Sequence, residues 1–119
     1  MDEPQALAAF SALAQEHRLR LVRALVKAGP EGRASGALAD AVGVSAATVS
    51  HHLKELSHSG LVASRREGRS IIYSAAFPAL AGLIDFLMRD CCQSRPEVCA
   101  PAVAALSACD CPTGDIAHA

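Results

Sequence analysis

The stretch from Val44 to Tyr73 constrains the fold of this 119-residue chain more than any other part of the sequence. Within it, Val49, Leu53 and Leu56 recur at the i, i+4 and i+7 spacing that places apolar side chains on one face of a helix. The opposite face carries small or hydrogen-bonding residues and no acid: Ala47, Ser50, His51 and Lys54. Such a narrow polar face suits close approach to base edges and phosphates in a DNA groove.

The residues before this helix predict a second, shorter helix and a tight turn. Ser35 is placed to cap a helix that ends at Gly43, with Leu38 and Val42 on its inner face. Ser45 can then cap the longer helix after a turn of only a few residues. Two helices joined in this way form a helix-turn-helix.

After the longer helix the hydrophobic pattern changes to that of a β-hairpin. Apolar and β-branched residues flank a charged tip that contains a glycine, in the order Leu61, Val62, Ala63, then Arg65, Arg66, Glu67, Gly68, Arg69, then Ile71, Ile72, Tyr73. The position of the three arginines beside the helix favours contact with the DNA backbone or minor groove, and a solvated turn is the alternative.

Three more helices are predicted outside this region. One begins near Pro4, a second runs from about Glu16 to Ala28, and a third covers about residues 78–91, while residues 31–34 are expected to form a loop. The second helix is expected to bury Leu19, Val22, Leu25 and Val26, and to carry Arg18, Arg20, Arg23 and Lys27 as a solvated face, with phosphate contact as the alternative. The third helix has a broad apolar stripe, Leu80, Leu83, Ile84, Leu87 and Met88, which favours dimerisation in so small a domain.

The run TVSHHLKEL, followed by SGLV and RREGRSIIY, resembles the ArsR/SmtB family of dimeric winged-helix metalloregulatory repressors. LAQEHRLRLV, which starts at Leu13, is similar to the opening of that family's second helix. The resemblance implies a mainly α fold with a small β-hairpin, a winged helix-turn-helix that is a homodimer through its first and last helices. It also implies binding to double-stranded operator DNA with half-sites about 34 Å apart. The residues expected to contact DNA are Ser45, Ala47, Thr48, Ser50, His51, Lys54, Arg65, Arg66 and Arg69, whereas His52 lies nearer the apolar stripe and is expected to pack inward.

Charge and composition limit the function classes. The net charge of −1 argues against a generally basic nucleic-acid binder, although residues 45–72 carry an excess of two positive charges. No basic leader opens the chain, and the apolar run at residues 75–88 is too short to cross a bilayer, so a cytoplasmic protein without a membrane partner is expected. In that compartment the five cysteines are expected to be thiols. Neither a Cys-His-Asn/Asp set nor a Gly-rich phosphate loop is apparent, so an enzyme is not expected.

Three cysteines follow the last predicted helix. Cys91 and Cys92 are adjacent, and Cys99 comes seven residues after Cys92, with Pro96 between them. On a continuous helix Cys92 and Cys99 would lie roughly 10 Å apart along the axis, so we expect Pro96 to let the chain fold back and bring the third sulfur to the pair. Three thiolates select a soft, thiophilic ion, and their binding is linked to proton release.

The resemblance narrows the choice of ion. The family's zinc site needs histidines that residues 75–90 lack, and its Cys-x-Cys site is absent because residues 37–42 read ALADAV. What remains is similar to the arsenic-sensing branch, which implies As(III), or Sb(III), as the inducer at Cys91, Cys92 and Cys99, without an organic cofactor. The alternatives are a Cd/Pb sensor, or a redox- or sulfide-responsive regulator in which Cys91 or Cys92 forms a disulfide with Cys99. Two further cysteines, Cys109 and Cys111, form either a second thiol site or part of a polar tail with no essential role.

The predicted organisation is therefore a DNA-binding and dimerisation domain at residues 1–95 and a cysteine-containing tail at residues 96–119. The expected mechanism is repression by the metal-free dimer. Binding of As(III) at the end of the last helix would change the angle between the two halves and release the DNA.

Overall fold

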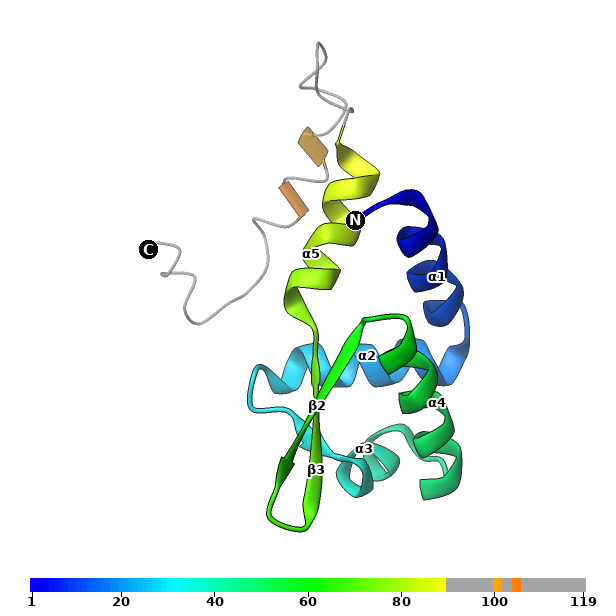
Figure 1. Cartoon of the computed structure of the whole chain (residues 1–119), viewed down its shortest axis with the longest axis vertical. Coiled ribbons are helices and arrows are strands. Elements are labelled where there is room, and N and C mark those ends of the chain that lie inside the picture. The colour runs from blue at the N-terminus through cyan, green and yellow to red at the C-terminus, as the bar shows by residue number, and fades with distance from the viewer. Residues whose placement is uncertain (90–99, 102–103, 106–119) are drawn as a thin grey trace. The chain divides into compact units, whose positions relative to one another are not determined.

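The computed structural model describes residues 1–89, 100–101 and 104–105. The chain divides into two units, Met1–Phe86 and Leu87–Ala119, and the first contains the predicted helix-turn-helix and hairpin. The elements follow in the order α1 (Glu3–Leu13), α2 (Glu16–Ala28), β1 (Arg33–Ala34), α3 (Ser35–Val42), α4 (Ala46–His58), β2 (Val62–Glu67), β3 (Ser70–Ala75) and α5 (Phe77–Met88) (Figure 1). The predicted fold class, a mainly α winged helix-turn-helix with a small β-hairpin, is confirmed.

Side-chain caps fix where the first two helices begin. The Asp2 carboxylate accepts a hydrogen bond from the Gln5 N–H at 2.9 Å, and the Gln5 side chain accepts one from the Asp2 N–H at 2.9 Å. This reciprocal pair is a capping box. At α2 the Gln15 side chain accepts a hydrogen bond from the Arg18 N–H at 2.9 Å.

The short helix α3 begins one residue earlier than its predicted cap implied. Ser35 is the first residue of α3, and Ala34 occupies the cap position without a side-chain hydrogen bond, so the prediction of Ser35 as the cap was wrong. The reason is that Ala34 also belongs to β1, so the preceding strand sets the start of the helix. The end is as predicted, because Gly43 has the left-handed conformation with φ of 73°.

The sheet has three antiparallel strands in the order β1-β3-β2, so β3 lies in the centre. The predicted hairpin is formed by β2 and β3, with Arg65 opposite Ile72. The loop expected at residues 31–34 was wrong for its second half, because Arg33 and Ala34 pair with Tyr73 and Ile72 as β1. A two-residue strand is too short to produce a periodic hydrophobic pattern, so β1 could not be predicted from the sequence.

The core lies between α2, α3, α4 and the base of the hairpin. Its largest fully buried side chains are Leu21, Leu25, Leu38, Val49, Leu53, Leu56 and Leu61. On α2 the expected stripe was partly wrong, because Leu19 and Val26 are 47% and 45% exposed and Leu21 is buried in their place. Apolar residues occur around much of α2, so its own pattern does not determine which side meets α1, α3 and α4.

The first and last helices keep large apolar side chains at the surface. On α1 the buried residues are Ala6, Ala9 and Ala12, whereas Leu7 and Phe10 are exposed. On α5 the buried residue is Leu83, and Phe77, Ile84 and Leu87 are exposed. The helix begins at Phe77, one residue before the prediction, and the predicted end at Cys91 lies outside the described residues.

Candidate nucleic-acid interface

Helix α4 begins at a serine cap in which two of the predicted DNA-contacting residues bind each other. The Ser45 Oγ accepts a hydrogen bond from the Thr48 N–H at 3.2 Å, and the two hydroxyls are 2.9 Å apart. Ser45 is exposed and Thr48 is half-buried. The cap satisfies one of the free N–H groups at the start of the helix.

The two faces of α4 have the predicted character. Val49, Leu53 and Leu56 have no exposed surface and hold the helix against the core. On the outer side, the four predicted residues are all exposed: Ala47, Ser50, His51 and Lys54. Since the first two side chains are small, the backbone of α4 can approach another surface closely here, with one imidazole and one ammonium group beside it.

His52 belongs to the inner side of α4, as the sequence predicted, and is only 8% exposed. Its ring lies 5.6 Å from that of His17 on α2 and 5.5 Å from that of His51, measured between centroids. The buried Nδ1 atom has no hydrogen-bond partner. Burial lowers the pKa of His52, and the positive charges of Arg18, His51 and His17 lower it further. The contact with His17 was not predicted, because no local sequence pattern relates the start of α2 to the middle of α4.

The hairpin presents three arginines, and the structure divides them into two kinds. All three are exposed. The guanidinium of Arg65 donates to the Glu67 carboxylate at 2.9 Å and reaches two backbone carbonyls of the loop after α2. Arg66 and Arg69 take part in none of the hydrogen bonds or ion pairs found within the described residues. Their guanidinium groups are therefore available to an external anion, whereas each guanidinium nitrogen of Arg65 already makes a hydrogen bond within the protein.

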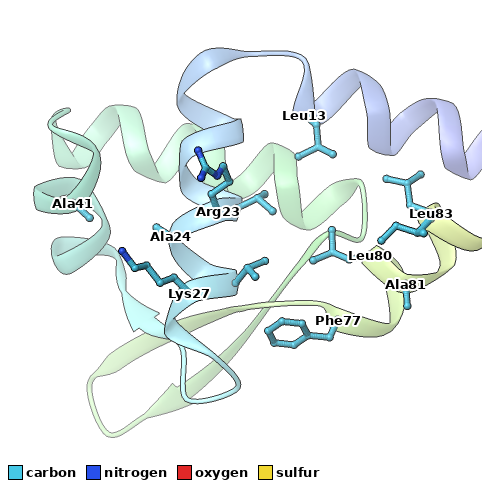
Figure 2. A pocket seen from close by; sticks show the side chains of 12 residues that line it. Leu13, Arg23, Ala24, Lys27, Ala41, Phe77, Leu80, Ala81 and Leu83 are labelled. Atoms are coloured by element: carbon cyan, nitrogen blue, oxygen red, sulfur yellow. The ribbon is translucent and has the colours of Figure 1, made fainter. Parts of the chain in front are cut away.

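A large apolar cavity of about 1140 Å³ opens within the first unit, between α2 and the start of α5 (Figure 2). It is lined by Leu13, Val22, Arg23, Ala24, Val26, Lys27, Ala41, Phe77, Leu80, Ala81, Leu83 and Ile84. Arg23 and Lys27 are the only charged residues of this lining. The sequence did not predict this cavity, because Val22 and Val26, which line it, were expected only to be buried.

The predicted thiol site lies beyond the part of the chain that can be described. Cys91, Cys92, Cys99, Cys109 and Cys111 all fall outside the described residues. Among residues 1–89, 100–101 and 104–105, no group of three or more His, Cys, Asp or Glu side chains is arranged to hold a metal ion. Within the same ranges, no helix is both long enough and apolar enough to cross a membrane.

Known proteins share both the sequence and the fold of this region. A family model described as a helix-turn-helix domain matches residues 13–65. The nodulation protein NolR of Rhizobium meliloti is 38% identical over 78 residues, which are 66% of this chain and 62% of NolR. A transcriptional repressor SmtB homolog of Synechocystis is 43% identical over 77 residues, 64% of this chain and 56% of that protein. The chain therefore spans less than two thirds of the length of either relative.

A solved structure agrees over a larger share of its length. The homodimeric winged helix-turn-helix DNA-binding domain of Mb0332 from Mycobacterium bovis, described as a possible ArsR-family transcriptional regulator, is 31% identical to this chain. The match has a TM-score of 0.57 and covers 72% of this chain and 84% of that domain. The helix-turn-helix with its three-stranded sheet thus defines a winged-helix protein. The chain belongs to the ArsR/SmtB family of winged-helix transcriptional regulators.

Proposed function

We propose that this chain is a repressor that binds double-stranded operator DNA as a homodimer and is released from it by As(III). The observation that carries the DNA-binding part is the outer face of α4, where Ala47, Ser50, His51 and Lys54 are exposed opposite a fully buried apolar stripe. In this proposal α4 lies in the major groove and the hairpin contacts the adjacent backbone or minor groove. The SmtB homolog is itself named a repressor.

The charges of this surface determine how the complex responds to salt. Lys54 on α4 and Arg66 and Arg69 on the hairpin are exposed and supply the phosphate contacts. Each phosphate that is neutralised releases counterions, so the logarithm of the affinity falls with the logarithm of the salt concentration by roughly 0.9 per contact. The net charge of −1 leaves the rest of the protein without a general attraction to nucleic acid.

A second copy of the chain covers the exposed apolar surface of the first and last helices. Large apolar side chains are exposed on both elements, namely Leu7 and Phe10 on α1 and Phe77, Ile84 and Leu87 on α5. Burial of exposed apolar surface stabilises a dimer by about 25 cal/mol per Å² removed from water. The Mb0332 domain is described as homodimeric. Dimerisation places two copies of α4 on one side of the DNA, one helical turn apart.

The inducer part of the proposal rests on the chemistry of the donor set. Cys91, Cys92 and Cys99 provide three sulfur ligands within nine residues, without a histidine among them. Soft thiolates select thiophilic ions, and As(III) prefers three sulfurs in a pyramid. When As(OH)₃ binds, each As–O bond is replaced by an As–S bond, and the thiol proton leaves with the hydroxide as water. A coupling free energy of about 1–3 kcal/mol between this site and the DNA site is enough to release the operator over a useful range.

The test is a titration of a protein–operator complex with arsenite, followed by fluorescence anisotropy. We expect the wild-type protein to release DNA, and Cys91→Ser, Cys92→Ser and Cys99→Ser to bind DNA normally without releasing it. Cys109→Ser serves as the matched thiol control, because it removes a cysteine that the proposed site does not use. If all three variants still release DNA, the thiol assignment is wrong, and if the wild type binds no promoter DNA, the DNA-binding proposal is wrong.

Parallel titrations separate the other effectors. Antimonite is expected to act like arsenite. Cadmium, lead or zinc acting alone would indicate a divalent-metal sensor. Release by peroxide, with a Cys91 or Cys92 to Cys99 disulfide in the mass spectrum, would indicate a thiol-redox regulator instead. Release by a polysulfide, which transfers a sulfane sulfur to a thiolate as its own S–S bond breaks, with a cysteine persulfide in the mass spectrum, would indicate a sulfide-responsive regulator.

A further inference from the structure

Arg65 ties the hairpin to a distant part of the chain. Its Nη2 donates to the Glu31 carbonyl at 2.8 Å, and its Nη1 lies 3.4 Å from the Pro30 carbonyl. These carbonyls belong to the loop between α2 and β1, more than thirty residues earlier in the sequence. Since β3 separates β1 from β2 in the sheet, this side chain connects β2 to chain on the other side of the central strand.

The same loop is held a second time, by its backbone. Gly32 has φ of 72° and is buried, and a Cβ atom added there would overlap the Tyr73 carbonyl oxygen on β3. The Gly32 N–H donates to the Gly29 carbonyl at 3.1 Å, which closes the turn that follows α2. The loop therefore packs against β3 at Gly32 and is hydrogen-bonded to β2 through the Arg65 side chain.

Each of the three guanidinium nitrogens of Arg65 makes one of these contacts. Its Nε donates to the Glu67 carboxylate at 2.9 Å, while Nη1 and Nη2 face the two carbonyls. The neighbouring carboxylate also offsets its positive charge. A phosphate contact by Arg65 would have to break this arrangement, whereas Arg66 and Arg69 have no such contacts within the described part of the chain.

We propose that Arg65 is a positioning residue of the DNA interface: it fixes the hairpin on the loop after α2, and Arg66 and Arg69 are the hairpin residues that contact DNA. This changes the expectation, drawn from the sequence, that all three arginines contact DNA. It rests on the proposed DNA-binding function, but its structural half, the brace between hairpin and loop, holds without DNA.

Substitution by lysine separates positioning from charge. Lysine keeps the positive charge, but its single ammonium group cannot reproduce the planar fork that serves two carbonyls and a carboxylate. If Arg65 were a phosphate contact, Arg65→Lys would bind DNA nearly as well as the wild type and Arg65→Gln would not. If Arg65 acts by positioning, both variants lose a similar amount of affinity, roughly fivefold to tenfold for partly exposed charge-assisted hydrogen bonds.

Two measurements on the full chain are needed. The first is amide hydrogen exchange of the free protein, where Arg65→Lys and Arg65→Gln are expected to speed exchange at Gly32 and in the neighbouring strand β1. Arg66→Gln and Arg69→Gln are the matched controls and should leave this exchange unchanged. The second is operator affinity as a function of salt, where each control is expected to lower the slope by roughly 0.9 and the Arg65 variants to leave it unchanged.

Exchange at Gly32 that is the same in the wild type and both Arg65 variants would overturn the proposal, whatever the DNA result. So would wild-type affinity in Arg65→Lys, or a reduced salt slope in Arg65→Gln. If the wild type binds no operator DNA, the proposed function fails, and the exchange experiment still decides whether Arg65 braces the hairpin.

Discussion

The imidazole rings of His17 and His52 lie 5.6 Å apart between centroids and are tilted by 44°. One ring comes from the first turn of α2 and the other from the middle of α4, so the pair joins the two helices just behind the proposed DNA-contacting face. The groups that act electrostatically on His52 are Arg18, His51 and His17, all of them cationic when protonated. A charge on His52 is therefore unfavourable in the folded protein.

Acidification is expected to destabilise the fold through this residue. Because the pKa of His52 is lowered on folding, the unfolded chain binds the proton more readily, and the free energy of unfolding rises with pH. The contribution of His52 is complete above its ordinary pKa of 6.5 and is lost as the pH falls below that value, through the lowered pKa of the folded state. Urea denaturation between about pH 5 and 8 measures it.

A neutral side chain at this position removes the effect. His52→Gln is expected to lose less stability than the wild type on going from neutral to acid pH, even if it is less stable at neutral pH. His58→Gln, on the exposed end of the same helix, is the matched control and should follow the wild type. Identical pH profiles for the wild type and His52→Gln would show that His52 is not the group responsible.

Gly32 is expected to be the least replaceable glycine of the first unit. Gly32→Ala adds a methyl group against the Tyr73 carbonyl and also requires a positive φ, so we expect a loss of more than about 3 kcal/mol or failure to fold. Gly43→Ala has a similar φ of 73° but open space around it, and should lose only about 1 kcal/mol.

Replacement of a third glycine is expected to stabilise the protein instead of destabilising it. Gly36 lies in the first turn of α3 with open space around its Cβ position, and its φ is not positive. Gly36→Ala should therefore stabilise the protein by about 0.5 kcal/mol, because alanine has less freedom to lose on folding. Thermal denaturation of the three variants tests the order, and a Gly32→Ala protein as stable as Gly43→Ala would contradict the close approach to β3.

Lys54 is expected to account for one phosphate contact. Lys54→Gln should weaken operator binding and reduce the slope of log affinity against log salt by about 0.9, because one fewer counterion is released. Lys27→Gln is the matched control, because it removes the same charge from the face of α2 that is predicted to be solvated and not to contact phosphate. A fall in slope of the same size in Lys27→Gln would instead support phosphate contact by α2.

Ile84 is expected to be needed for dimerisation. It is 45% exposed on α5 and also lines the apolar cavity, so a charge there would remain buried and unpaired at the proposed dimer contact. Ile84→Lys should convert the dimer to a monomer in sedimentation equilibrium. Ile71→Lys introduces the same charge at a similarly exposed position, 42%, on the hairpin and should remain dimeric. A dimeric Ile84→Lys protein would place the interface elsewhere.

The elements with a strict repeat were the ones that the sequence could predict. The spacing of Val49, Leu53 and Leu56 defined the buried face of α4, and Ser45 defined its start, as the structure confirms. On α2 the apolar residues are too many for a single stripe, and only its neighbours decide that Leu21 is buried and Leu19 is not.

Contacts between distant segments could not be predicted in this way. The pairing of Arg33 with Tyr73, and the reach of Arg65 to the loop after α2, depend on how three strands align, which no local pattern records. Sequence reasoning assigned Arg65 by its place in a basic run. The positioning role proposed for Arg65 follows instead from its hydrogen-bond partners, which lie more than thirty residues away in the sequence.

Ala6, Ala9 and Ala12, the buried residues of α1, set the position of a helix that belongs to the proposed dimer contact. Because alanine side chains are small, α1 packs close to the core, and these three residues set the packing distance between α1 and the core. Enlarging one of them would lift the helix and carry Leu7 and Phe10 outward with it. A substitution at one of these buried alanines is therefore expected to alter subunit pairing indirectly, by moving the exposed side chains of α1.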